Sequence, residues 1–296
     1  MNGKRTLCFI GAHPDDETFG LGSTLAHYAT AGVQVYYVCA TRGEAGMNSL
    51  NQLGEFESLG DLRSQELGCA AKILGLAGVV HLGYRDSGML GTDDNKHPEA
   101  LAVAPVDEVS GRIVKVFRSL KPDVVITHDP IGGYGHPDHI AVHNATVKAF
   151  EIAADPAKYL EAGSAFQPQK LYYHVFSRKL LKVTVRLMPL FGQDPHHFGQ
   201  NKDVDLASLA EVDFPIHAVI RPSKAAVRMR NEAMLCYASQ GGSGPSRRNL
   251  LFLIRRLLGQ RDSFMRAYPP ARGDREHDLF EKANYNIGER IDKRSP

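Results

Sequence analysis

The chain has 296 residues, of which 43% are hydrophobic and 23% charged, and its formal net charge is +2. This is the composition of an ordinary folded globule with enough apolar material for a core, so a largely disordered chain is excluded. The small net charge also excludes a protein that attracts nucleic acid or an anionic membrane through bulk electrostatics. The length fits one α/β domain with an appended subdomain.

The cysteines and the start of the chain bear on the cellular compartment. No two of the four cysteines form a C-x-x-C pair, and three lie in apolar runs, so we expect free thiols and no disulfide. The first strand follows residues 1–5 without the hydrophobic region of a signal peptide, and no stretch is long enough to span a membrane. We therefore expect a cytoplasmic protein with neither a membrane nor a nucleic acid as partner.

Apolar runs alternate with helical patterns over the first half of the chain, which predicts a succession of βαβ units. Helices are expected where apolar residues recur at three- and four-residue steps. Right-handed crossovers then give a Rossmann-like, doubly wound and mostly parallel sheet. The expected strands are 6–12, 33–40, 78–82 and 123–128, and the expected helices are 18–31, 61–75, 106–120 and 137–154.

Prolines break the second half into shorter pieces. There we expect strands at 170–176 and 212–220 and a helix at 224–237, followed by a loop at 241–245. Residues 247–258 have basic ends and an apolar middle, which favours a core-packing helix with snorkelling arginines over an interfacial membrane helix.

These patterns divide the chain into two parts. The sequence predicts a Rossmann-like catalytic core over residues 1–155 and a smaller α+β region over residues 156–296 that completes the fold and shapes the substrate pocket.

Two short clusters of histidines and carboxylates follow apolar runs, at residues 12–17 (AHPDDE) and 135–139 (GHPDH). Proline suits the first position of a helix, so His13 and His136 become N-cap residues. Asp16 and His139 then occupy the third helical position, whose side chain folds back toward the cap. Because the carboxyl ends of parallel strands meet at one edge of a sheet, we expect both clusters to form one site.

The chemistry of the clusters favours a metal. Three acidic residues in the first turn exclude the phosphate site that bare N–H groups would make there. Nitrogen and oxygen donors suit zinc, which in catalytic sites has three protein ligands and a water, and iron(II) fits the same set. Taken singly, a His-Pro pair is often only an N-cap and an acidic pair only a first-turn feature. Two matching clusters favour the metal site.

Together the two clusters resemble the paired signature of the PIG-L, or LmbE-like, zinc-dependent de-N-acetylases. The resemblance covers about the first 150 residues. It implies that the metal is held by His13, Asp16 and His139. No metal role is implied for His143, although it lies four residues after His139, and we expect His128 also to be structural.

The resemblance also assigns the catalytic roles. Asp15 is the general base that takes a proton from the metal-activated water. A protonated His136, oriented or charge-tuned by Asp138, stabilises the oxyanion with the metal, and Tyr134 is a further donor. The proton needed by the departing amine comes from Asp15 or His136.

Three segments between the clusters resemble substrate-facing segments of the family. Arg63 and Asp86 correspond to positions that bind sugar hydroxyls in relatives acting on N-acetylglucosaminyl compounds, and Glu44 is a further candidate. Alternatively, Arg63 pairs with Glu66 on its own helix, and Asp86 only caps a turn.

Two further segments bear on the branch of the family. Residues 83–89 (GYRDSGM) resemble the branch that contains mycothiol biosynthetic deacetylases and mycothiol-conjugate amidases. Tyr237 stands where many relatives have a histidine, so a role for that histidine has no counterpart here.

The sequence thus predicts a zinc hydrolase that removes an acetyl group from the 2-amino nitrogen of a glucosamine-containing small molecule. The first alternative is an amidase that removes a bulkier acyl group from a glucosaminyl thiol conjugate. The second is a non-catalytic sugar- or metal-binding member of the fold, against which the presence of Asp15 and His136 argues. The oligomeric state is left open, a homo-oligomer included.

Overall fold

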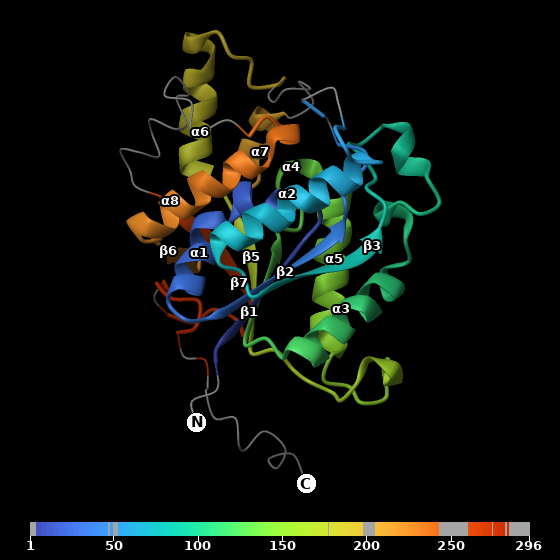
Figure 1. Ribbon diagram of the computed structural model, residues 1–296. Helices are drawn as coiled ribbons and strands as arrows, with labels where there is room; N and C mark the ends of the chain where they lie inside the picture. Colours follow the sequence, from blue (N-terminus) through green and yellow to red (C-terminus); the bar gives the residue numbers. More distant parts are fainter. Residues whose placement is uncertain are drawn as a thin grey trace.

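The structure is a computed structural model that describes residues 4–46, 48–49, 53–176, 178–197, 205–242, 260–273, 275–281 and 283. Its described strands form one seven-stranded sheet in the order β3-β2-β1-β4-β5-β7-β6 (Figure 1). The five strands from β3 to β5 are parallel, whereas β7 runs antiparallel to both β5 and β6. The strands are β1 (Thr6–Gly11), β2 (Gln34–Thr41), β3 (Gly78–Tyr84), β4 (Val124–His128), β5 (Lys170–Val175), β6 (Ala218–Ile220) and β7 (Asp262–Tyr268).

Helices cover both faces of this sheet. On one face α3 and α5 pack on the sheet through an apolar cluster that includes Ile113, Phe117 and Val142. On the other face α1 and α2 pack through Leu25 and Leu67. The helices are α1 (Gly22–Thr30), α2 (Leu59–Leu74), α3 (Val106–Leu120), α4 (Gly132–Gly135), α5 (Pro137–Ile152), α6 (Arg178–Leu187), α7 (Leu206–Glu211) and α8 (Lys224–Ala233). The predicted doubly wound, mostly parallel sheet is confirmed.

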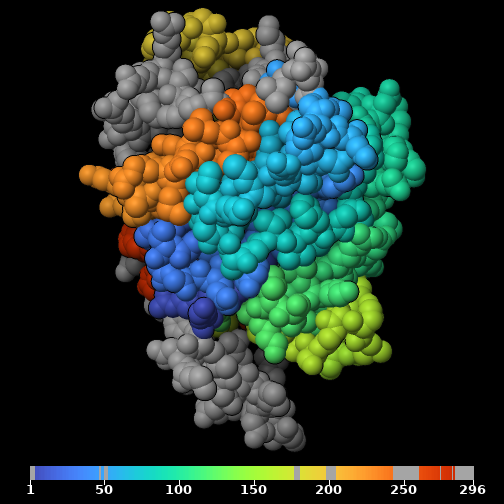
Figure 2. All heavy atoms as spheres, viewed as in Figure 1, coloured from blue at the N-terminus to red at the C-terminus, as the bar shows by residue number. Residues whose placement is uncertain are grey.

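A C-terminal helix joins the face formed by α1 and α2. Ala226 and Ala233 of α8 share a buried cluster with Ala26 of α1 and Ala70 of α2. Figure 2 shows the atoms of α8, in orange, directly beside those of α1 and α2. Small residues at these positions allow the helices to approach closely. Residues far apart in the sequence thereby reach the end of the sheet that carries the two clusters.

The strand ends place both clusters at one point of the sheet. The neighbouring strands β1 and β4 continue directly into the segments that carry residues 12–17 and 132–139. The strand order reverses between them, since β2 and β3 lie on one side and β5 on the other. Such a switch point is where open α/β sheets place their sites.

The predicted helix start is correct at the second cluster and wrong at the first. His136 is the N-cap of α5, its Nδ1 accepts from the Asp138 N–H at 3.2 Å, and Pro137 is the first helical residue. At the first cluster the cap is Asp15, which precedes a short π-helix, η1 (Asp16–Gly20), and α1 begins only at Gly22. The reason is that the Asp16 carboxylate binds the N–H groups at 12 and 13, which holds the chain in a turn before any helix begins.

The second half contains elements that the sequence patterns did not predict. The strands expected at 170–176 and 212–220 correspond to β5 and the shorter β6, but β7 follows later and inserts between them. Helices α6 and α7 also lie in segments that prolines had marked as irregular. All three C-terminal strands extend the same sheet. The division at residue 155 stays a prediction.

The expectation of four free cysteines is wrong for two of them. Cys69 on α2 and Cys236 are joined by a disulfide, with Cα atoms 5.9 Å apart, whereas Cys8 and Cys39 are free and buried. The sequence could not indicate this pair because the two cysteines are 167 residues apart and meet only when α8 packs on α2. The expectation of a reducing compartment loses the support that it drew from free thiols.

Within the described residues, no helix is both long and apolar enough to cross a membrane. Residues 247–258, for which a core-packing helix is expected, lie outside the described residues.

Candidate metal centre and active site

The Asp16 carboxylate lies at the centre of the site and is held in a fixed orientation. Its Oδ2 accepts the backbone N–H groups of Ala12, at 2.9 Å, and His13, at 3.0 Å. Its Oδ1 faces Nε2 of His139 at 3.3 Å. Although burial opposes its charged form, the nearby rings of His139 and His128 hold the Asp16 pKa well below its usual range. Asp16 is therefore an ionised carboxylate aimed at a histidine.

His128 at the end of β4 belongs to the same group. Its Nε2 lies 3.3 Å from Asp16 Oδ2, and its ring stacks on that of His139 with centroids 3.8 Å apart. The Nε2 atoms of both histidines are buried and have no hydrogen-bond partner. The expectation that His128 is only structural missed this placement. The signal in the sequence was its position at the end of a strand that neighbours β1.

His13 lies among further carboxylates. Its Nε2 is 3.1 Å from Asp138 Oδ2 and 3.5 Å from Asp86 Oδ1. Burial disfavours a charged ring, but Asp86, Asp138 and Asp16 outweigh it and raise the His13 pKa well above its usual value. The carboxylates around His13 therefore stabilise positive charge at this point.

The residues present fit a divalent metal. Two buried ring nitrogens without hydrogen-bond partners, together with several carboxylates, make a nitrogen and oxygen donor set that needs a cation. The described residues contain three groups whose ligand atoms lie within 4.8 Å of one another, which are His13, His136 and His139; Asp16, His128 and His139; and His13, Asp86 and Asp138. The predicted set of His13, Asp16 and His139 is divided between the first two groups, which share His139. It stays a prediction as a ligand set.

Asp15 lies beside this group without belonging to it. One carboxylate oxygen, Oδ2, accepts from the Arg63 guanidinium at 2.8 Å. Its backbone has φ 118°, a region that residues other than glycine seldom adopt. Burial raises the pKa of Asp15 to about 6, although Arg63 opposes the rise. A carboxyl group that titrates this close to neutrality can both accept and return a proton.

The surroundings of His136 and Asp138 bear on their predicted roles, which stay predictions. Burial, together with the neighbouring rings of His13 and His139, lowers the His136 pKa to about 2, which favours a neutral ring over the expected protonated one. Asp138 does not orient it through its carboxylate. That carboxylate instead accepts from the N–H of Ser87 at 2.9 Å and from the Ser87 hydroxyl, and it lies against His13. Only the backbone N–H of Asp138 bonds to His136.

The ring of Tyr134, on the short helix α4, lies at the edge of the group. Its centroid is 5.2 Å from that of His139 and 5.9 Å from that of His136. The side chain is 39% exposed, so the tyrosine stands between the histidines and solvent. This position is compatible with the predicted donor role, which stays a prediction.

His143, which we kept out of the site, lies one helical turn beyond His139. Its Nδ1 lies 2.9 Å from the His128 carbonyl oxygen, so it supports the chain next to His128.

The predicted substrate residues lie around the same group, in different environments. Arg63 is only 3% exposed and donates to Asp15 and to the carbonyls of Pro14, at 2.6 Å, and Gly43, at 3.0 Å. The alternative that it pairs with Glu66 is wrong. Asp86 accepts from the Gly88 N–H at 2.8 Å, which is the turn cap considered as its alternative, while also facing His13.

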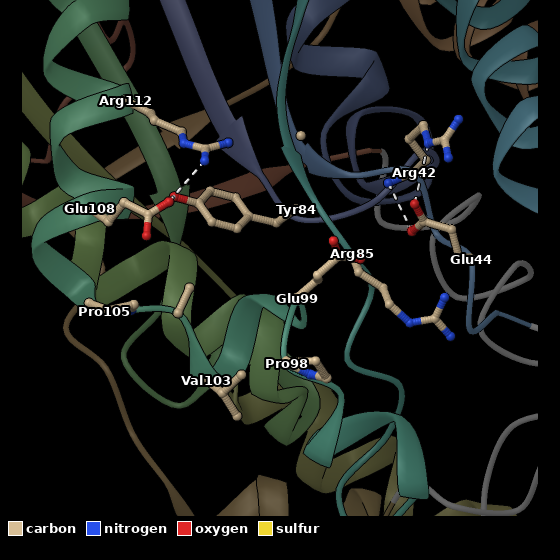
Figure 3. A pocket seen from close by; sticks show the side chains of 12 residues that line it. Arg42, Glu44, Tyr84, Arg85, Pro98, Glu99, Val103, Pro105, Glu108 and Arg112 are labelled. Carbon is tan, nitrogen blue, oxygen red and sulfur yellow. Dashed lines mark hydrogen bonds and ion pairs between the residues drawn. The ribbon is translucent and has the colours of Figure 1, made fainter.

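Glu44 connects the site with a pocket of about 470 Å³. Its Oε2 accepts from the Asp86 N–H at 3.1 Å, and its side chain lines the pocket together with Tyr84, Arg85 and Arg112 (Figure 3). The guanidinium of Arg112 lies over the Tyr84 ring and bonds Glu108, and that of Arg85 bonds Asp94 at 2.6 Å. The lining arginines thus have carboxylate partners, so the pocket carries no excess positive charge.

A doubly wound sheet with histidines and aspartates gathered at its switch point defines the class of this protein, an α/β protein with a site able to hold a metal. Residues 8–150 match the PIG-L family, whose description is GlcNAc-PI de-N-acetylase. The chain is 36% identical to the 1D-myo-inositol 2-acetamido-2-deoxy-alpha-D-glucopyranoside deacetylase of Geodermatophilus obscurus, over 95% of this chain and 98% of that protein. It is 34% identical to the enzyme of the same name from Acidothermus cellulolyticus, over 93% and 94% of the two chains.

The chain therefore belongs to the PIG-L family, and the prediction of an enzyme of the deacetylase class is confirmed. Among solved structures, the fold is similar to that of the conserved protein TT1542 from Thermus thermophilus, with a TM-score of 0.57 and 21% identity. That similarity covers 90% of this chain and 96% of the other, and it concerns the fold alone.

Proposed function

We propose that this protein hydrolyses the acetamide bond of a glucosaminyl-inositol, the substrate that the names of the Geodermatophilus and Acidothermus relatives state for those proteins. The observation that carries the proposal is the position of Asp15. Its carboxylate lies beside the histidine and aspartate donors, one oxygen is fixed by Arg63, and the other has no hydrogen-bond partner among the described residues. A carboxylate that is held in place but does not bind the metal can act as the general base of amide hydrolysis.

In this reaction the residues of the site have separate roles. A divalent metal bound by His13, Asp16 and His139, with zinc favoured, would polarise the acetamide carbonyl and lower the pKa of the attacking water. Asp15 takes a proton from the attacking water while the water oxygen bonds to the carbonyl carbon. Arg63 keeps the carboxylate aimed during the transfer.

His136 serves the oxygen of the scissile carbonyl. Since its Nδ1 accepts from the Asp138 N–H, the proton of the neutral ring is on Nε2, which can donate to the developing negative charge. The C–N bond then breaks, and the proton held by Asp15 passes to the departing amine. The products are acetate and a free 2-amino sugar.

The proposal is tested by release of the free 2-amine from N-acetylglucosaminyl-inositol, N-acetylglucosamine and a glucosaminide with a bulky N-acyl group, with acetate measured as the second product of the two acetylated compounds. We expect release of acetate by metal-loaded enzyme, and its loss both after chelation and in the Asp15→Asn variant. Faster cleavage of the bulky acyl group would instead identify the amidase alternative. Absence of all cleavage from protein that binds metal stoichiometrically would identify a non-catalytic sugar or metal binder.

A further inference from the structure

Glu17 is a buried carboxylate that the proposed reaction does not use. It is 0% exposed, and its Oε2 accepts the backbone N–H of Asp15 at 3.0 Å. Its Oε1 accepts from the hydroxyl of Tyr237 at 2.6 Å and from that of Thr18 at 2.5 Å. Burying a carboxylate is costly unless donors surround it. The three donors offset this cost, so the question is what a carboxylate does at this buried position.

The backbone of Asp15 supplies that explanation. At φ 118° and ψ −27° it occupies a conformation that is unfavourable for a residue with a side chain and persists only where its surroundings impose it. The Glu17 carboxylate fixes the N–H of this peptide, and Arg63 fixes the carboxylate of the same residue. Asp15 is thus held at its backbone N–H by Glu17 and at its carboxylate by Arg63.

Tyr237 comes from a distant part of the chain and is itself firmly anchored. It lies 220 residues after Glu17 in sequence and is 0% exposed. Next to it, Cys236 is bonded to Cys69, and Ser239 donates to the Glu66 carboxylate from its N–H, at 2.8 Å, and its hydroxyl, at 2.6 Å.

Both anchors of Tyr237 end on α2, the helix that also carries Arg63. One helix therefore fixes the carboxylate of Asp15 through Arg63 and its backbone through Tyr237 and Glu17.

We propose that Glu17 and Tyr237 are positioning residues, which hold the Asp15 peptide in its left-handed conformation and thereby aim its carboxylate at the water. The expected effect on kcat rests on the proposed function, because it requires Asp15 to be the base. The hold of Glu17 and Tyr237 on the Asp15 backbone does not depend on it. Displacing a base by about 1 Å costs on the order of 100-fold in rate while substrate contacts stay in place. The two residues therefore act on kcat and leave KM unchanged.

The test compares Tyr237→Phe with Tyr172→Phe in the metal-loaded enzyme. Tyr172 is a matched control because it is equally buried and also donates to a carboxylate, that of Glu276, at 2.6 Å. We expect Tyr237→Phe to lower kcat about 10- to 100-fold with KM and metal content unchanged. Tyr172→Phe should lose comparable stability and keep kcat. Equal kcat in the two variants would overturn the proposal while leaving the proposed function intact.

A second pair of variants and a structural readout complete the test. Glu17→Gln keeps an acceptor for the Asp15 N–H and a donor for the Tyr237 oxygen, so we expect it to retain most of the kcat that Glu17→Ala loses. In crystal structures of Tyr237→Phe and Glu17→Ala, the Asp15 backbone should leave the left-handed region. An unchanged Asp15 in both would overturn the proposal, even if the wild-type protein released no acetate and the proposed function failed.

Discussion

Two groups of buried charged side chains among the described residues are built differently. The first, which we call the catalytic cluster after the proposed function, consists of His13, Asp16, His128 and His139, and the second, the C-terminal cluster, of Lys170, Tyr172, Arg266 and Glu276. In the C-terminal cluster both Glu276 oxygens are used, by Lys170 at 2.9 Å and Arg266 at 2.5 Å on one side and by Tyr172 at 2.6 Å on the other. The Lys170 ammonium also donates to two carbonyl groups.

The catalytic cluster leaves two histidine nitrogens without a hydrogen bond at its centre. The Nε2 atoms of His128 and His139 are buried with no hydrogen bond, beside a carboxylate that is already ionised. Arg266 Nε in the C-terminal cluster also has no hydrogen bond, but a guanidinium nitrogen cannot bind a cation, whereas an imidazole nitrogen can. The type of unpaired atom therefore separates a network that stabilises the fold from one that awaits a ligand. Burial and charge alone would not have distinguished the two.

The largest effect is expected from removing a donor of the catalytic cluster. His139→Ala should lower kcat at least about 1000-fold, because the cation that would stabilise the developing charge loses a ligand. The free energy of unfolding without metal should fall less than in the C-terminal cluster, because His139 Nε2 faces only the Asp16 carboxylate, which two backbone N–H groups continue to hold. Acetate release, metal content and urea unfolding of the stripped protein would measure this. A large loss of stability in the stripped protein would show that the cluster is structural.

The opposite result is expected in the C-terminal cluster. Glu276→Ala leaves the Lys170 ammonium and the Arg266 guanidinium buried without their carboxylate, which should lower the free energy of unfolding by about 3–5 kcal/mol. The kcat of the folded protein should stay the same. Urea unfolding and kinetics at a temperature where the variant is folded would measure both. Unchanged stability would mean that this cluster contributes little to the fold.

A smaller effect is expected at His128. Its Nε2 lies next to the Asp16 oxygen that two backbone N–H groups already hold, so we expect His128→Ala to weaken metal affinity about 10- to 100-fold. Competition with a fluorescent zinc chelator would measure the affinity of the variant and of the wild-type protein. Equal affinity in the two proteins would confine His128 to a structural role.

The smallest effect is expected from pH. A general base must be deprotonated, and the pKa of Asp15 is raised to about 6 by burial in the absence of a cation. A bound cation lowers that pKa, so kcat/KM should fall about tenfold per pH unit on the acid side of an inflection at or below pH 6. The pH profile of acetate release would show it. A profile without an acid limb would argue against Asp15 as the base.

The strand ends and the two clusters could be predicted because the signals are local. An apolar run followed by His-Pro marks a strand end in the sequence itself, and parallel strands bring such ends together. His136 therefore lies at the expected cap, with His139 one turn away. The predicted helix with His13 as its N-cap was wrong because the carboxylates of Asp16 and Glu17 bind backbone N–H groups there. A sequence pattern does not show whether such a carboxylate will bind the backbone in place of a regular helix start.

What could not be predicted depends on contacts between distant parts of the chain. Tyr237 reaches Glu17, and Cys236 reaches Cys69, only because α8 packs on α1 and α2. β7 was missed because its pattern of alternating apolar and polar residues is short. Its place between β5 and β6 depends on pairing between segments far apart in the sequence. His128 was set aside since a single histidine at a strand end is usually structural, and its role depends on the Asp16 orientation.

The disulfide between Cys69 and Cys236 also determines what proteolytic cleavage of the chain produces. It closes a covalent loop across a separation of 167 residues, which includes α6 and α7 and the exposed side chains of Leu190 and Phe191. A protease that cuts once in this loop leaves two pieces that remain one molecule until a reductant is added. A nicked preparation would therefore run as a single band on a non-reducing gel and as two bands on a reducing gel.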